Sequence, residues 1–423
     1  MFDLLQGVRV LELAVLINGD NVGMLLADLG ADVIKVEAPP VGDYIREFLG
    51  LVKPHYSLNA LHLLKGKRSI AVDLRTVEGR AIFDRLLATT DIFVTGLTAD
   101  ACEKLGIGYD AQRKVKPDII FVQYTGFGAT GPYASIPTHG RHMNAQVGGV
   151  PVEMCADGFV RHVYNRDFMG GTQPASPGPM AGAPYAALAA VAALQRRGAT
   201  GQGSYIDVAA SDAVLASSWI GATMNFNHSR VTDWTGAPSA EPRDPYSEGD
   251  GSSRYQIYET KDRRFVLFAC IEGKFFHKFC RAIGRDDLID PAAANNFADF
   301  GIGEDAERHA LQAIFHTRTQ AQWIELAIEN DLAIGPVHRL ADVPDDPHNR
   351  ARGILRETVH PQAGPYTAIS FPAIVDGQRY EVSRHAPVMG EQTREVLLEL
   401  GYGQGEIDRL LDQGVIADRY RTK

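Results

Sequence analysis

Short runs rich in valine and isoleucine alternate with segments of helical spacing over the first 124 residues of this chain. Residues 8–13 and 31–37 have the composition of buried strands, and residues 21–29 between them have the spacing of a helix that ends at Gly30. A helix that connects two such strands crosses back over the sheet, so the strands pair in parallel. The chain is therefore predicted to have an α/β fold built on a mostly parallel sheet.

The same alternation continues along the chain. Three more runs have the composition of strands, namely residues 68–74, 91–95 and 118–124. Residues 76–90 are predicted to form a helix with Thr76 as its N-cap. The turn after the first strand, residues 14–20, lacks the pattern G-x-G-x-x-G, so a classical dinucleotide site is not expected. Repeated units of this kind predict a doubly wound, Rossmann-like large domain.

The length of 423 residues exceeds the usual size of a single core, so two domains are expected. The large domain is predicted to contain residues 1–224 and, after an insertion, residues 334–423. Residues 225–254 are rich in Gly, Pro and Ser without periodicity, which is typical of a linker. Residues 255–333 are predicted to form a smaller α+β domain. Its expected elements are a hairpin at 255–260 and 264–269 and helices at 274–283, 305–317 and 319–329, and a helix at 391–400 is expected near the C-terminus.

The composition argues against several classes of protein. With 52 acidic and 42 basic residues, the net charge of −10 disfavours nucleic acid or an anionic membrane surface as the main partner. The cysteines lie far apart without a C-x-x-C pattern, at Cys102, Cys155, Cys270 and Cys280. Neither a metal site nor a disulfide framework is predicted from them, and a reduced, cytoplasmic setting is expected. No apolar run reaches 18 residues, so no membrane span is expected.

A helix of small residues is predicted at 180–197. It is followed by the glycine-bearing turn 198–203 and by a strand at 204–208. Together with motifs elsewhere, this segment carries a resemblance to one family. The other motifs are Gly7–Leu11, Leu26–Glu37, Gly42-Asp43 with Arg46, Lys67–Ile70 with Asp73-Leu74, Gly126–Tyr133, Gly335–Val337, Ala351–Gly353 and Pro387–Glu391.

With these motifs in this order, almost the whole chain resembles the family III CoA-transferases of the CaiB/BaiF type, such as the formyl-CoA:oxalate and carnitine CoA-transferases. The resemblance implies a large domain made from both ends of the chain, with a smaller domain inserted in it. It also implies two subunits that interlock like links, and CoA thioesters as substrates with no further cofactor. In such enzymes a carboxylate attacks the donor thioester and carries the acyl group and then CoA.

The position of that carboxylate is occupied by a proline. In the family the nucleophilic Asp stands six residues before the aromatic residue that opens an Ala-Ala-Leu run. Tyr185 is that aromatic residue here, and six residues earlier lies Pro179. Because proline has no nucleophilic atom, the chain is predicted to lack the covalent step of the family.

The resemblance also implies contacts with CoA or substrate. They fall on Val15, Leu16, Asn18, Arg75, Leu97, Lys104 and His139. Other positions depart from the family: Ala38 stands where an Arg commonly meets phosphate, and Gly140 stands where an acidic residue is usual. Residues 95–100 replace an Asn-aromatic turn, and Asp100 adds negative charge there. These departures together predict a CoA site that is no longer used in the usual way.

The favoured hypothesis is a subunit without a nucleophile, paired with a homologous subunit that carries the Asp. Such a pair would move CoA from succinyl-CoA to a dicarboxylate such as benzylsuccinate. Asp167 could instead supply the nucleophile of an active homodimer. His139 and Asp167 could exchange a proton as in the α-methylacyl-CoA racemases, although Asp167 lies twelve residues before Pro179 and the racemase Asp only about one. A scaffold without catalysis is the fourth alternative, in which His139 is a polar loop residue and Asp167 pairs with Arg166.

Overall fold

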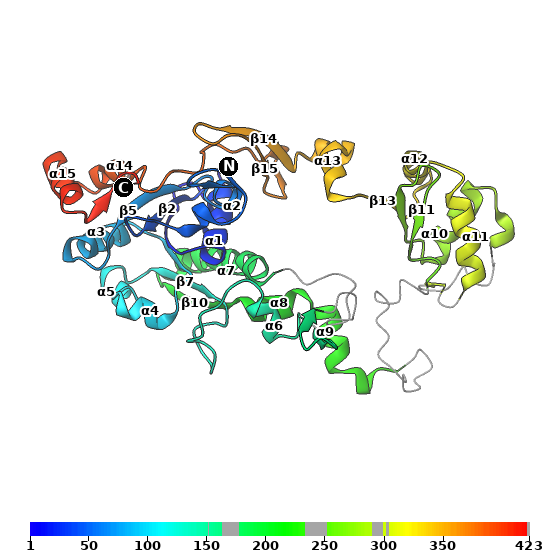
Figure 1. The fold of residues 1–423 in the computed structure, drawn as a ribbon, viewed down its shortest axis with the longest axis horizontal. Helices are drawn as coiled ribbons and strands as arrows, with labels where there is room; N and C mark the ends of the chain where they lie inside the picture. The colour runs from blue at the N-terminus through cyan, green and yellow to red at the C-terminus, as the bar shows by residue number, and fades with distance from the viewer. Residues whose placement is uncertain (151, 163–176, 233–251, 290–298, 302–303, 421–423) are drawn as a thin grey trace. The chain divides into compact units, whose positions relative to one another are not determined.

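The computed structural model describes residues 1–423 except 151, 163–176, 233–251, 290–298, 302–303 and 421–423 (Figure 1). The chain divides into two compact units. The larger unit contains the described residues up to Trp219 and those from Ala351 onward, and the smaller unit contains Ile220–Arg350. The domain boundaries predicted from the sequence stay predictions. Most of the predicted linker lies outside the described residues, and its start belongs to a helix, α9 (Trp219–Phe226).

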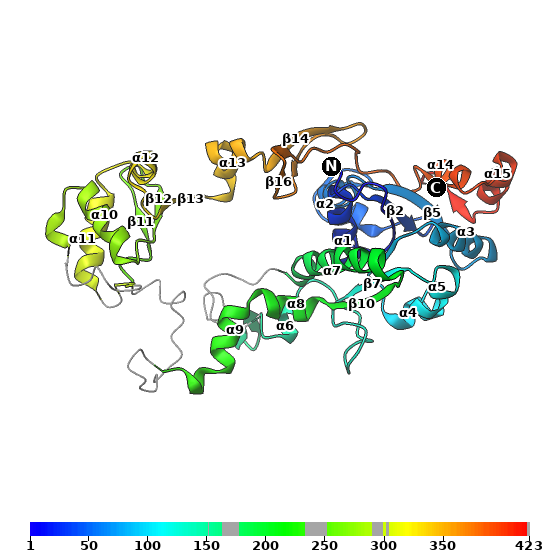
Figure 2. The ribbon, with the colours of Figure 1, turned by 180° about the vertical axis from the view of Figure 1, so that it is seen from behind.

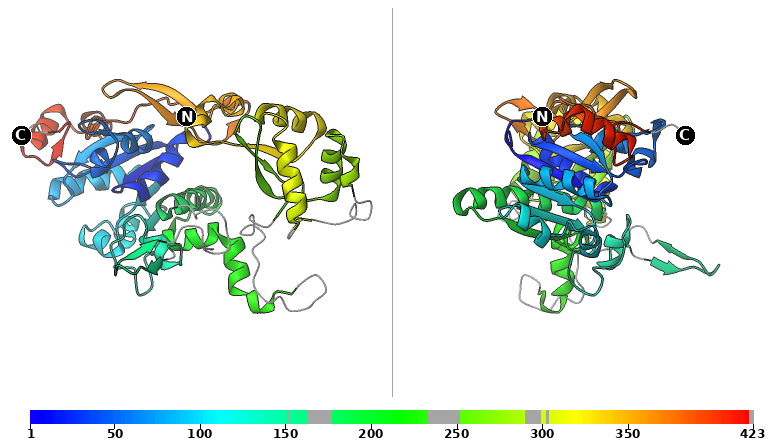
Figure 3. Two further views of the ribbon diagram at one scale, coloured as in Figure 1. Left: turned by 45° about the vertical axis from the view of Figure 1, so that its right-hand side comes forward. Right: turned by 90° about the vertical axis from the view of Figure 1, so that its left-hand side faces the viewer.

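A seven-stranded sheet forms the centre of the larger unit. Its strands, in spatial order, are β10 (Ser204–Ala209), β7 (Ile120–Thr125), β6 (Ile92–Thr95), β1 (Arg9–Leu13), β2 (Asp32–Glu37), β5 (Arg68–Val72) and β18 (Ile416–Ala417). The first six strands are parallel, and β18 is antiparallel to β5. The predicted parallel α/β sheet is confirmed. The sequence did not predict β18, which brings the C-terminal segment beside β5 (Figure 3).

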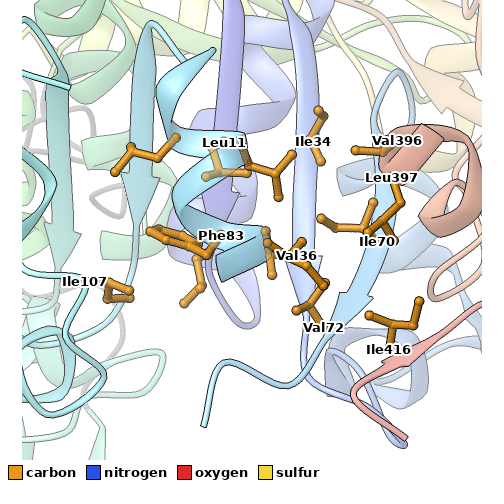
Figure 4. Close-up of a cluster of buried hydrophobic side chains, with 14 of the residues drawn as sticks. Leu11, Ile34, Val36, Ile70, Val72, Phe83, Ile107, Val396, Leu397 and Ile416 are labelled. Carbon is orange, nitrogen blue, oxygen red and sulfur yellow. The ribbon is translucent and has the colours of Figure 1, made fainter. Parts of the chain in front are cut away.

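Helices cover both faces of this sheet because side chains of a strand alternate between the faces. On β1, Val10 belongs to a core with α1 (Ile17–Asp28) and α7 (Gly178–Thr200), which lie side by side (Figure 2). Leu11 belongs to the opposite core, which Figure 4 shows with Ile34, Ile70 and Leu397. The helices of that core are α3 (Val77–Ala88), α4 (Ala99–Lys104), α5 (Tyr109–Val115), α14 (Thr393–Glu399) and α15 (Gln404–Asp412). The layers are therefore those of a doubly wound sheet.

Local signals in the sequence account for some of the helix ends. Thr76 caps α3, and its hydroxyl accepts a hydrogen bond of 3.0 Å from the amide of Gly79, as predicted. Helix α7 is longer than predicted, because it continues through Gly198 and stops only at Gly201, whose φ of 69° is left-handed. Helix α1 also begins earlier than predicted, at Ile17.

The remaining elements of the larger unit are short. They are β3 (Leu51–Lys53), β4 (Tyr56–Ser57), α2 (Leu58–Leu63), α6 (His142–Gln146), β8 (Val152–Met154), β9 (Val160–His162), α8 (Ala210–Ser217), β14 (Leu355–His360), β15 (Gly364–Ile369), β16 (Ile374–Val375) and β17 (Gln378–Arg379). A 3-10 turn, η1 (Tyr44–Glu47), follows β2. Helix α13 (Pro347–Arg352) spans the boundary between the two units.

The smaller unit is an α+β structure. The predicted hairpin is confirmed as β11 (Gln256–Glu259) and β12 (Phe265–Phe268), and β13 (Ile334–Val337) adds a third antiparallel strand. The predicted helices are α10 (Gly273–Ala282), α11 (Asp305–Phe315) and α12 (Gln320–Asn330). They pack around buried aromatic side chains such as Phe315 and Trp323. Within the described part of the chain, no helix has the length and apolar character needed to span a bilayer.

Candidate functional site

A cavity of about 730 Å³ lies beside the carboxyl ends of β1, β6 and β7. In the strand order of this sheet, β1 is the point from which the strands are added in opposite directions, and open α/β sheets bind ligands at such a point. The residues that line the cavity are Val15–Asn18, Tyr44, Phe48, Gly96–Thr98, Ala101, Thr125–Phe127, Ala134, Ile136–Gly140, Met143 and Pro179. Most of these side chains are apolar, as in a site that encloses an organic ligand.

Most of the contact residues expected from the sequence meet in this cavity. They are Val15, Leu16, Asn18, Leu97 and His139, and Pro179 lines the same space. Arg75 lines a neighbouring cavity, and Lys104, at the end of α4, lines neither of these two. Asp167 lies outside the described residues.

Pro179 is the second residue of α7, where a missing amide hydrogen costs no helical hydrogen bond. The carbonyl before it, that of Gly178, accepts a hydrogen bond of 2.6 Å from the Tyr124 hydroxyl. The Gly178 amide donates to Asn144 Oδ1 at 2.9 Å, and the Pro179 carbonyl accepts from Asn21 Nδ2 at 3.4 Å. The start of α7 is therefore held by three side chains. Among the described residues, no carboxylate lines the cavity beside it.

A second cavity of about 510 Å³ shares Val15 and Leu97 with the first. It follows the ends of β1, β2 and β5, and Arg75 is the cation among its described lining residues. The Arg75 guanidinium pairs with Asp73 at 2.8 Å, and this hydrogen bond lowers the pKa of the Asp73 carboxyl. Glu37 and Asp43 also line this cavity. Its acidic side chains would repel a phosphate, and its one described cation is already paired. We therefore expect this cavity to bind phosphate more weakly than a cavity lined by several free cations.

Asp43, which lines the second cavity, belongs to a cluster of buried charges. The Lys35 ammonium pairs with Asp20, with Asp43 at 2.8 Å and with Glu12 at 3.4 Å. The Lys67 ammonium pairs with Glu12 at 2.7 Å. Burial raises the pKa of Asp20 and of Asp43 to about 6 each, and Lys35 opposes the rise in both. The pKa of Lys35 is raised, because these carboxylates outweigh the effect of its burial.

Glu37, at the end of β2, is held in a network of hydrogen bonds. Its carboxylate accepts hydrogen bonds of 2.6 and 3.0 Å from the Arg46 guanidinium, and one from the Ser69 hydroxyl. It also accepts from the amide of Asp43 at 2.9 Å. Burial alone would raise the pKa of Glu37, but Arg46 lowers it to about 2. This pair fixes the chain that follows β2.

The turn between β1 and α1 is strained. Leu16 has φ 63° and ψ −143°, a conformation that side chains with a Cβ rarely adopt and that costs on the order of 1–3 kcal/mol. The Leu16 amide donates to both carboxylate oxygens of Asp43, at 3.1 and 3.2 Å. Sequence reasoning named Leu16 but missed this partner, which is 27 residues away.

Thr125 is a second residue that the sequence reasoning missed. It is the last residue of β7, and it lines the first cavity. The residue is 5% exposed, and its hydroxyl has no hydrogen-bond partner among the described residues. A buried hydroxyl without a partner is rare, and one at a cavity can donate to a ligand carbonyl. The only signal in the sequence was its place between a predicted strand and Gly126. The backbone amide of His139, another lining residue, donates to His142 Nδ1 at 2.9 Å.

No group of three or more His, Cys, Asp or Glu side chains within the described ranges could hold a metal ion. The four cysteines are free, and Cys102, Cys270 and Cys280 are buried.

Comparison with known proteins agrees with this geometry. The model of CoA-transferase family III matches residues 5–393. The (R)-2-hydroxy-4-methylpentanoate CoA-transferase of Clostridioides difficile is 28% identical, over 98% of this chain and 99% of that protein. The beta subunit of the succinyl-CoA–L-malate CoA-transferase of Chloroflexus aurantiacus is 28% identical, over 97% of this chain and 98% of that protein.

Solved structures show the same fold. The crystal structure of a CaiB/BaiF family protein from Brucella suis matches with a TM-score of 0.68 and 28% identity. The match covers 94% of this chain and 99% of that chain. The family model, the relatives and the structure all extend over nearly the whole length. This chain therefore belongs to CoA-transferase family III.

Proposed function

We propose that this chain is the subunit without a nucleophile in a heteromeric CoA-transferase that moves CoA between carboxylic acids. The observation that carries the proposal is the place of Pro179. It lines the cavity together with most of the expected CoA contacts. The resemblance assigns to this residue the position of the family Asp. No carboxylate among the described lining residues stands in for it. A homologous subunit that carries the Asp would then perform the covalent step.

The proposed donor is succinyl-CoA and the proposed acceptor is a dicarboxylate such as benzylsuccinate. Apolar side chains in the cavity, among them Phe48, Phe127 and Ile136, would pack against the hydrocarbon part of such an acid. The name of the Chloroflexus relative, a beta subunit, supports the idea of a two-subunit enzyme. That CoA thioesters serve as substrates without a further cofactor stays a prediction.

The proposed assembly is interlocked, with a one-to-one ratio of the two subunits. An interlocked pair buries far more surface than a standard interface of about 1,600 Å², so neither subunit is expected to persist as a folded monomer. We also propose a cytoplasmic location, and the free cysteines of the described chain fit a reducing compartment.

Co-expression tests the proposal. Co-expression of this chain with an Asp-bearing homologue should give a stable one-to-one complex in which CoA transfer from succinyl-CoA appears. Replacing the nucleophilic Asp of the homologue with Asn should abolish transfer, whereas Asp167→Asn in this chain should leave it largely intact. Full activity of this chain as a pure homodimer, lost in Asp167→Asn, would overturn the assignment and identify Asp167 as the nucleophile.

Two further outcomes distinguish the remaining alternatives. Exchange of the α-proton of a methylacyl-CoA with solvent deuterium, lost in His139→Ala, would support a racemase. A stable monomer without activity in any combination would favour a scaffold. Mass spectrometry of chains that copurify from the native host would identify the partner subunit directly.

A further inference from the structure

The strained turn after β1 is held from two sides by one buried ion pair. The Lys35 ammonium donates a hydrogen bond of 2.9 Å to the carbonyl of Ala14. The Asp43 carboxylate accepts from the amide of Leu16 at 3.1 and 3.2 Å. Lys35 Nζ and Asp43 Oδ2 lie 2.8 Å apart, and both side chains are almost completely buried. The residue between the two held peptide groups is Val15, which lines both cavities.

Leu16 needs an external acceptor to stay in its conformation. With φ 63° and ψ −143°, it is outside the regions that L-residues prefer, and it has no side-chain cap at the start of α1. The hydrogen bonds from the Leu16 amide to Asp43 therefore supply the stabilisation that this backbone conformation lacks by itself. The ionised Asp43 carboxylate accepts from the Leu16 amide and from the Lys35 ammonium. Such hydrogen bonds are charge-assisted and stronger than those between neutral groups.

Asp43 is itself placed rigidly. Its amide donates to Glu37 Oε2 at 2.9 Å, and its carboxylate also caps η1 by accepting from the amide of Ile45 at 2.9 Å. Gly42 before it has φ 74°, and a Cβ there would lie 2.8 Å from Glu37 Oε2. The carboxylate therefore reaches Leu16 from a fixed point at the end of β2.

We propose that Asp43, oriented by Lys35, is a positioning residue that holds the turn of Ala14–Leu16 in the conformation that lines the ligand cavity. The role in ligand binding rests on the proposed CoA site. The role in holding the turn concerns the chain alone and can be measured without a ligand.

Protonation of Asp43 should loosen the turn. The charged and titratable groups that face Asp43 are Lys35 and Glu37 of β2, Asp20 of α1, Tyr44 and Arg46 of η1, and Tyr420 near the C-terminus. Burial and Asp20 raise the pKa of Asp43 to about 6, against the effect of Lys35. As the pH falls through 6, the carboxylate gains a proton and loses its ion pair. Hydrogen bonding to Leu16 then weakens.

The turn can be tested by amide hydrogen exchange resolved to single residues. Asp43→Asn removes the charge and keeps the shape, and it should speed the exchange of the Leu16 amide by about tenfold or more. Asp28→Asn is the matched control. The Asp28 carboxylate also pairs with a buried lysine, since its Oδ2 lies 3.1 Å from Lys65 Nζ, but it makes no hydrogen bond to the turn. The control should leave Leu16 exchange at the wild-type rate. Equal rates in wild type and Asp43→Asn would overturn the proposal.

If Asp43→Asn does not fold, the wild-type chain provides the same comparison. After correction for the intrinsic rate at each pH, Leu16 should be less protected at pH 5 than at pH 7.5, and no change would count against the proposal. Titrations with CoA, followed by ligand-observed NMR, test the link to binding. Affinity should fall about tenfold in Asp43→Asn and not in Asp28→Asn.

The two proposals can fail separately. If co-expression with an Asp-bearing homologue gives no CoA transfer while Asp43→Asn still exposes the Leu16 amide, the proposed function is wrong and the positioning role stands. If CoA binds equally well to Asp43→Asn and to wild type, Asp43 does not position the ligand-binding turn.

Discussion

The Tyr124 hydroxyl donates a 2.6 Å hydrogen bond to the carbonyl of Gly178, the residue directly before Pro179. The tyrosine is fully buried at the end of β7, and its ring also lies against Gly182, one turn further along α7. The start of α7, which carries the position of the family nucleophile, is therefore fixed by the central sheet.

The contact with Tyr124 makes Gly182 sensitive to substitution. A Cβ at Gly182 would lie 2.4 Å from the Tyr124 ring, so Gly182→Ala should lower the free energy of unfolding by about 1–3 kcal/mol. Gly198→Ala in the same helix is the matched control, since a Cβ there meets nothing within 4 Å. The control should be stabilising by about 0.5–1 kcal/mol, because Ala is the better helix former. Urea unfolding of both variants measures the difference, and equal effects would contradict the packing argument.

Thr125 is expected to contribute to ligand binding and not to stability. Its hydroxyl has no described partner, so Thr125→Val should leave the free energy of unfolding unchanged or higher. Thr90→Val is the control, because the Thr90 hydroxyl donates to the carbonyl of Leu86 at 2.9 Å and its loss should cost about 0.5–1.5 kcal/mol. Chemical denaturation checks both values. Thr125→Val should weaken binding of a CoA thioester, and a stability loss as large as that of Thr90→Val would refute the assignment.

The isolated chain is expected to bind CoA more weakly than millimolar. The resemblance implies that Ala38 stands where the family commonly has an Arg. A charged hydrogen bond contributes roughly 1.5–3 kcal/mol, or about tenfold or more in affinity. Ala38→Arg should therefore tighten CoA binding, as measured by calorimetry or ligand-observed NMR. Ile328→Arg adds the same charge at a side chain that is 78% exposed in the smaller unit, and it should have no such effect. Micromolar binding by the wild-type chain would contradict this prediction.

No acyl adduct is expected on this chain. Incubation with succinyl-CoA, followed by trapping with hydroxylamine or borohydride, should leave every carboxylate unmodified, because Pro179 has no nucleophilic atom. Peptide mass spectrometry checks the result, and an Asp-bearing family member treated in parallel shows that the trap works. A labelled peptide from residues 160–180 would reverse the conclusion and point to Asp167.

Local pattern in the sequence was enough to predict much of the fold. The alternation of strand and helix runs gave the parallel sheet, and Thr76 marked a helix start, because capping depends on near neighbours in the chain. The later elements α15 and β18 were missed. Strand β18 has only two residues, Ile416 and Ala417, and it exists because β5 offers an open edge.

The candidate site was only partly accessible to sequence reasoning. That residue 179 has no nucleophilic atom follows from the sequence alone, because a proline side chain carries none. Asp43 and Thr125 could not be assigned roles, because their importance depends on groups that are distant in the chain or on the lack of any partner.

From the sequence alone came the resemblance to the family, the parallel α/β sheet with several of its helices, and the expectation that a proline stands at the nucleophile position, because these depend on motifs and periodicity along the chain. Only the tertiary structure decided that Lys35 and Asp43 hold the turn at Leu16, and that burial raises the pKa of Asp43 to about 6. Hydrogen bonding and burial depend on distances in space. Folding brings together segments whose separation along the chain carries no record of these distances.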